Sequence, residues 1–187
     1  DPQHGWRNVE LLPLIADREA YFAPGTNYAA SNSNFILLGV MIEAVEGDHI
    51  QAVFNRRIFE PAEMINTSFG RYPRPALLAR GFDDANGDGQ LEDVTDYDVG
   101  DQLADGGVIS TAADMVKFAR ALFVDGVLLG PNALARATTD TVFAGDGSYG
   151  YGLMIGSSDW GPVWGHDGIY FGYSAEFSWF PEQELFL

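Results

Sequence analysis

The spacing of apolar residues divides the chain into a helical first part and a strand-rich second part. Apolar positions recur at helical spacing over 35–45, after a run of Ser and Asn that offers N-cap oxygens at residues 31–34. Gly47 then suits a helix C-terminus. Residues 48–59 show the same spacing, and Pro61 excludes a longer helix. We therefore expect two successive helices, the first with a Ser31 or Asn32 side-chain cap.

Two more helices are predicted further along the chain. Thr111 followed three residues later by Asp114 is a variant of the capping box, and Met115 and Phe118 follow on one helical face. Pro131 favours the first position of another short helix.

From Tyr149 the pattern changes to alternation. Strands are predicted over 149–155, 163–166 and 174–180, and a further strand begins at Leu185. Helices followed by strands, without βαβ alternation, predict an α+β fold. We expect a mostly helical region over 1–148, with an acidic loop at 83–101, packed on the antiparallel sheet of 149–187.

Composition narrows the function classes. The 187 residues are 47% hydrophobic, enough for a core, and no apolar run approaches the length of a membrane span. The net charge of −17 repels phosphate, so neither a nucleic acid nor an anionic lipid surface is an expected partner. The absence of Cys excludes disulfides and thiolate chemistry within this chain.

The acidic loop contains the front half of a calcium-binding pattern. Oxygen-bearing side chains recur at alternate positions, followed by Gly89, which would allow a sharp turn. Thr95 stands where the pattern requires Glu, so the missing carboxylate would come from a neighbouring Asp. The alternative is a solvated acidic loop without metal. The candidate ligands are Asp84, Asn86, Asp88, Gln90 and Asp93, with Asp96 or Asp98 as substitutes for Asp93.

A search for nucleophile motifs is negative. No Gly-x-Ser-x-Gly occurs, and Asp114 stands three residues before Lys117, the only lysine. The segment from Trp164 to Gly168 is a polar turn or a strand edge that presents His166; from these residues alone the turn is favoured. The chain begins at Asp1 without Met and ends in an apolar run, so we expect it to be a piece of a longer protein that is incomplete at both ends.

Several motifs nevertheless occur in a recognisable order. They are Pro24-Gly25-Thr26, Ser31-Asn32, Leu37-Leu38-Gly39, Ile58-Phe59-Glu60-Pro61, Ser110-Thr111-Ala112-Ala113-Asp114, Tyr149-Gly150-Tyr151-Gly152-Leu153 and Gly165-His166-Asp167-Gly168. This ordered set resembles the serine β-lactamase-like superfamily, in particular class C β-lactamases, D-alanyl-D-alanine carboxypeptidases and related esterases. The resemblance implies a helical region against an antiparallel sheet, with the site between them, and a Ser-x-x-Lys nucleophile motif that this chain does not contain.

The resemblance also implies roles for individual residues. The Tyr-x-Asn motif of the family falls on Ala30 and Asn32, so Asn32 matches and the tyrosine that moves protons is absent. His166 and Gly168 match His-x-Gly; His166 would orient substrate, and Gly168 would allow close approach. The backbone N–H of Ile169 would form half of an oxyanion hole.

The expected function is therefore an acyl-enzyme hydrolase that cleaves an amide, ester or β-lactam carbonyl of a small-molecule or peptide substrate. It needs no cofactor for catalysis, although calcium would stabilise the structure. Two alternatives remain. Because of Ala30, the protein could be an inactive relative that binds peptide or cell-wall-like ligands. Because of the acidic loop, it could be a calcium-stabilised binding module. Export to the periplasm or the extracellular space is expected by family likeness. The segments of the domain that precede and follow this chain would be its partners.

Overall fold

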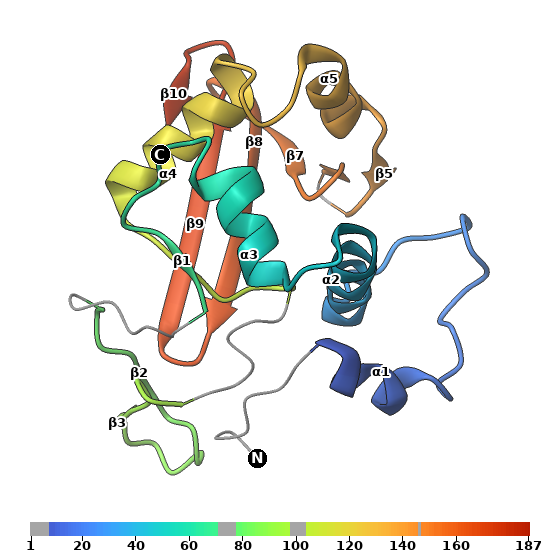
Figure 1. Ribbon diagram of the computed structural model, residues 1–187, viewed down its shortest axis with the longest axis vertical. Coiled ribbons are helices and arrows are strands. Elements are labelled where there is room, and N and C mark those ends of the chain that lie inside the picture. Colours follow the sequence, from blue (N-terminus) through green and yellow to red (C-terminus); the bar gives the residue numbers. More distant parts are fainter. Residues whose placement is uncertain (1–7, 71–77, 98–103, 146) are drawn as a thin grey trace.

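The computed structural model describes residues 8–70, 78–97, 104–145 and 147–187 (Figure 1). The helices precede the six-stranded antiparallel sheet, with two short strand pairs among the helices in sequence, which confirms the predicted α+β class. The helical elements are α1 (Asn8–Ile15), α2 (Asn32–Glu46), α3 (Ile50–Phe54), η1 (Asn55–Phe59), α4 (Ala112–Ala119), η2 (Arg120–Val124) and α5 (Pro131–Thr139).

Six strands form the large sheet, in the order β10-β9-β8-β7-β6-β5. They are β5 (Val142–Phe143), β6 (Ser148–Tyr149), β7 (Met154–Ser158), β8 (Gly161–Tyr170), β9 (Tyr173–Phe180) and β10 (Leu185–Phe186). Two short pairs lie outside this sheet: β1 (Ser68–Phe69) with β4 (Val108–Ile109), and β2 (Phe82–Asp83) with β3 (Glu92–Asp93).

The predicted helix ends are partly correct. Gly47 is left-handed, at φ +64°, and its N–H donates to the carbonyl of Glu43. Thr111 Oγ1 accepts the N–H of Asp114 at 3.2 Å, as the capping box predicts. The predicted side-chain cap of α2 is wrong: Ser31 is the N-cap residue, but its hydroxyl makes no capping bond, and its backbone carbonyl accepts the N–H of Asn34 instead.

The helix predicted over 48–59 forms in two parts. It is α-helical from Ile50 and changes to π-type hydrogen bonding at Asn55, without leaving the right-handed helical region. His49 caps its start by accepting the N–H of Gln51 on Nδ1.

The strand predictions need two corrections. The segment 149–155 is not one strand, because Gly152 turns the chain at φ +77° between β6 and β7. The segment 164–168 is not a turn either: β8 continues through it to Tyr170, since each of these residues pairs with one on β9. The turn follows at residues 171–172.

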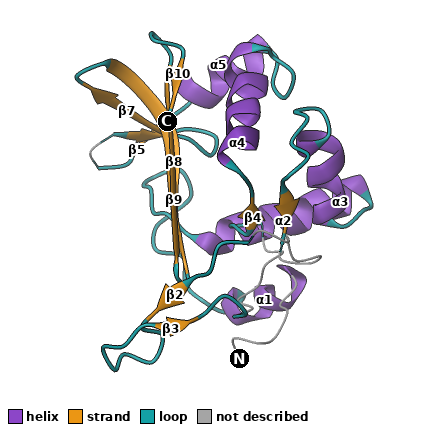
Figure 2. Ribbon diagram, turned by 90° about the vertical axis from the view of Figure 1, so that its left-hand side faces the viewer, coloured by secondary structure: helices purple, strands orange, loops and turns teal. Residues whose placement is uncertain are grey.

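Aromatic side chains join the helices to the sheet. The core gathers Ile50, Phe59, Met64 and Phe69 with Ala62 and Ala121. Phe118 of α4 meets Phe177 of β9, and Phe123 of η2 packs on Trp164 and Trp179. These contacts define one face of the sheet, on which the helices lie (Figure 2). None of the helices described has the length and apolar character needed to cross a bilayer.

Candidate functional site

The C-terminal half of β8, residues 166–170, has a partner strand on one side only. Pairing with β7 ends at Met154 and Gly165, whereas pairing with β9 continues to Tyr170 and Tyr173. From His166 onward, therefore, the other edge of β8 faces no strand among the described residues. An open edge of this kind can accept an extended peptide as an additional strand.

The backbone N–H of Ile169 faces this open edge. Ser178 exchanges both backbone hydrogen bonds with Leu187, so its polar groups point toward β10. Because the direction alternates along a strand, Phe177 points its groups at β8 and pairs with His166. By the same alternation along β8, the backbone N–H and C=O of Gly168 are directed toward β9. The backbone N–H and C=O of Asp167 and Ile169 are directed away from β9, toward the open edge. Ile169 as a residue is 88% exposed, so this edge of β8 lies beside solvent.

His166 is held by two hydrogen bonds. Nδ1 lies 2.6 Å from the backbone carbonyl of Asp167, and Nε2 lies 2.9 Å from the hydroxyl of Tyr149. A carbonyl oxygen only accepts, so Nδ1 carries a proton. In the neutral ring, Nε2 then accepts from the Tyr149 O–H. The imidazole is 35% exposed. It lies on the face of the sheet that the helices cover, because Phe177, the residue opposite His166 on β9, contacts Phe118 of α4.

Tyr149 connects His166 to the segment that precedes α2. The ring of Tyr28 lies 5.5 Å from that of Tyr149, tilted by 31°. Burial raises the pKa of Tyr149, and the neighbouring Tyr28 raises it further. The structure thus brings His166 close to the segment that carries Ala30 and Asn32. Sequence reasoning did not select Tyr149 as a site residue; its place in the Tyr-Gly-Tyr-Gly motif was the available signal.

Gly168 leaves open space on the His166 face of β8. A Cβ added at Gly168 would meet no atom within 4 Å. At Gly165 a Cβ would instead lie 2.2 Å from the carbonyl oxygen of Phe177. Gly165 is therefore required by packing, whereas Gly168 leaves room for a ligand.

Asn32 and Ala30 are both exposed. Asn32 is the first residue of α2, and Ala30 lies two residues beyond the Tyr28 ring. The amide of Asn32 has no hydrogen-bond partner in the described part of the chain, so it is available to a ligand.

The acidic loop forms the connection between β2 and β3. Asp84 accepts the N–H groups of Asp88 and Gly89, and Asp88 accepts that of Gln90. Asp93 points elsewhere and pairs with Arg80; hydrogen bonds from Thr95 and Arg80 lower its pKa.

No three His, Asp or Glu side chains within the described residues are arranged to hold a metal. Asp93 is bound by Arg80 and Thr95, and Asp98 lies outside the described residues. Calcium binding by Asp84, Asn86, Asp88, the Gln90 carbonyl and Asp93 stays a prediction.

Asp114 and Lys117 belong to the helical framework. The fully buried carboxylate of Asp114 accepts the N–H of Asn66 at 2.6 Å, the hydroxyl of Thr67 at 3.0 Å and the ammonium of Lys117 at 3.0 Å. Burial alone would raise the pKa of Asp114, but these hydrogen bonds outweigh it and the pKa is lowered. The pair joins the start of α4 to the segment before β1.

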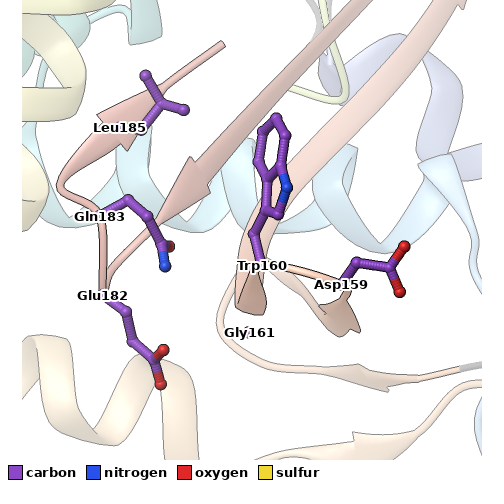
Figure 3. Close-up of a pocket in the computed structure, with 6 residues that line it drawn as sticks. All are labelled: Asp159, Trp160, Gly161, Glu182, Gln183 and Leu185. Carbon is purple, nitrogen blue, oxygen red and sulfur yellow. The ribbon is translucent and has the colours of Figure 1, made fainter.

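A hollow at the far end of the sheet contains none of these residues. It lies between the β7–β8 and β9–β10 turns, with Trp160 standing between Asp159 and the Gln183–Leu185 side (Figure 3). Because Gly161 begins β8 and Ile169 lies near its other end, the hollow is distinct from the site around His166.

Known proteins similar to this chain include a D-aminopeptidase, a D-stereospecific amidohydrolase and a penicillin-binding protein. The D-aminopeptidase of Cereibacter sphaeroides is 27% identical over 178 residues, which cover 91% of this chain and 33% of that protein. A D-stereospecific amidohydrolase from Streptomyces sp. is 28% identical with a TM-score of 0.87, over 97% of this chain and 55% of its own.

The penicillin-binding protein of Bacillus halodurans is 28% identical with a TM-score of 0.83, over 96% of this chain and 56% of its own. The chain thus spans about a third of that curated relative and about half of these solved structures. A family model described as Beta-lactamase matches residues 1–187, and the chain therefore belongs to the Beta-lactamase family.

Proposed function

We propose that this chain is part of a serine hydrolase that cleaves amide bonds through an acyl-enzyme. The open edge of β8, with the Ile169 N–H directed outward beside His166, carries the proposal. Such an edge aligns an extended substrate, and an outward N–H stabilises the negative charge that develops on a carbonyl oxygen during attack.

An amide is the favoured substrate class because the similar proteins named above are a D-aminopeptidase and a D-stereospecific amidohydrolase. By analogy, we propose amides and short peptides of D-amino acids as substrates. The space beside Gly168 would take part of the acyl group, and the free amide of Asn32 would hydrogen-bond it.

The reaction proceeds in two steps. A serine hydroxyl from a segment outside these 187 residues adds to the amide carbonyl carbon; its proton is removed, and the amine departs with a proton to leave an ester on the enzyme. Water then adds to that ester and releases the acid. The chain provides the Ile169 donor, the substrate edge and the His166 side chain for both steps.

A fluorophosphonate probe tests the proposal on the full-length protein. We expect the probe to label a serine three residues before a lysine and to abolish hydrolysis of a D-amino acid amide. A protein that is neither labelled nor active toward amides, but that binds a D-amino acid peptide in calorimetry, would instead be the inactive ligand-binding relative that Ala30 suggests.

Calcium at the β2–β3 loop is a separate proposal. The alternating oxygens of Asp84, Asn86 and Asp88 support it, together with the repulsion among the acidic residues of the loop. If calcium binds, a chelator lowers the Tm of the native protein and leaves the Tm of Asp84→Asn unchanged. If the native protein has the same Tm with and without chelator, calcium binding at this loop is contradicted.

A further inference from the structure

Position 30 lacks a phenol, while another phenol lies in contact with the site histidine. Tyr149 is half-buried on β6, 2.9 Å from Nε2 of His166, and its ring packs against Tyr28, two residues before Ala30. We infer that Tyr149 is a proton-relay residue that connects the reacting groups to His166 and replaces the tyrosine missing at position 30. The inference rests on the proposed amide hydrolysis.

The direction of the hydrogen bonds makes the relay chemically consistent. Nδ1 of His166 donates to the Asp167 carbonyl, so Nε2 of the neutral ring has a lone pair and accepts the proton of Tyr149. The Tyr149 oxygen keeps its own lone pairs for a second donor. A phenol that donates to a base and still accepts is arranged to pass a proton on.

The proton transfers balance both when the serine attacks and when the amine departs. During acylation the serine O–H proton moves to the Tyr149 oxygen, the Tyr149 proton moves to Nε2, and the serine oxygen forms its bond to the carbonyl carbon. The ring becomes an imidazolium and the phenol stays neutral. When the amide C–N bond breaks, Nε2 returns its proton to Tyr149, and Tyr149 protonates the departing amine.

Two features of the surroundings agree with a neutral relay. Burial and the adjacent Tyr28 raise the pKa of Tyr149, which disfavours a tyrosinate base and leaves the imidazole as the final acceptor. The packing of Tyr28 against the ring also fixes the orientation of the phenol.

The experiment compares four variants of the full-length protein: Tyr149→Phe, Ala30→Tyr, the double variant Ala30→Tyr/Tyr149→Phe, and Tyr151→Phe. Tyr151 is a matched control, since it is exposed and, among the described residues, its hydroxyl is hydrogen-bonded to Arg136 alone, at 3.5 Å. We measure kcat and KM for a D-amino acid amide, together with Tm.

For Tyr149→Phe we expect kcat to fall by about 10²–10⁴-fold, the range for loss of general acid–base catalysis, with KM nearly unchanged. Tyr151→Phe should keep wild-type activity. The double variant should recover at least about a tenth of wild-type kcat, because a phenol at position 30 restores proton transfer. A purely structural Tyr149 would not be rescued from position 30.

Different failures have different meanings. A folded Tyr149→Phe variant that is as active as wild type, or a double variant as inactive as Tyr149→Phe, overturns the relay and leaves the hydrolase proposal standing. A wild-type protein without amide hydrolysis or probe labelling overturns the hydrolase proposal, and the relay with it.

Discussion

Gly168 and Gly165 lie on the same strand and differ in what surrounds them. A methyl group at Gly168 occupies the open space on the His166 face, so Gly168→Ala should leave the Tm nearly unchanged and weaken amide turnover at least about tenfold by excluding substrate. Gly165→Ala should destabilise the protein, because its methyl would overlap the Phe177 carbonyl. Thermal melts and kcat/KM check both; equal activity of Gly168→Ala and wild type would show that substrate lies elsewhere.

Asp114 is the buried charge on which the start of α4 depends. Replacing it with Asn removes the charge from three hydrogen bonds and takes from Lys117 its ionic partner, although Lys117 keeps its hydrogen bond to the Glu63 carbonyl. We therefore expect a loss of about 2–3 kcal/mol in the free energy of unfolding at neutral pH. Asp140→Asn is the control, since Asp140 forms an exposed pair with Arg136 and should change stability little.

The effect of Asp114 depends on pH in a defined direction. Its pKa in the folded protein is below the ordinary value of 3.8, so its contribution is complete above that value and is lost as the pH falls through the lowered pKa. The stability difference between wild type and Asp114→Asn should therefore narrow in acid, as urea unfolding at several pH values would show. If the difference in unfolding free energy between wild type and Asp114→Asn stays constant down to pH 2, the lowered pKa of Asp114 is contradicted.

At the scale of elements, the proposed role of β8 depends on its backbone. Ile169→Pro removes the N–H that faces the open edge and spares the β8–β9 ladder, since position 169 does not bond to β9. We expect kcat to fall by about 10²–10³-fold, the loss seen when one oxyanion-hole donor is removed. Ile169→Ala keeps the N–H and trims only an exposed side chain, so it should remain active; equal losses in both variants would contradict a backbone role.

Local sequence patterns predicted most helices and strands, but they did not predict the features that depend on pairing between distant strands. Thr111, Gly47 and Pro131 mark helix ends by short-range chemistry, and the structure confirms them. His166-Asp167-Gly168 has the composition of a turn, yet pairing with β9 keeps it extended. Tyr149 and His166 are 17 residues apart, and only the sheet register brings their side chains together. The match to His-x-Gly selected His166 and Ile169 as candidate site residues, which propensity alone did not.

At the scale of the whole molecule, the helices cover one face of the sheet (Figure 2). His166 lies on that face, because its cross-strand partner Phe177 contacts Phe118 of α4. The candidate site therefore lies between the helical region and the strands. The protein around it is strongly acidic, with 27 Asp and Glu against 10 Lys and Arg. This charge acts on any substrate that approaches the site.

The acidity predicts how salt changes substrate selection. An amino acid amide with a free ammonium group is attracted to a negative protein, whereas its N-acetyl derivative is neutral and is not. Raising the ionic strength from about 0.01 M to 1 M shortens the Debye length from about 30 Å to 3 Å. In the full-length protein, kcat/KM for the cationic amide should then fall several-fold while that of the acetylated amide stays nearly constant. Parallel responses of the two substrates would mean that the charge of this chain does not reach the site.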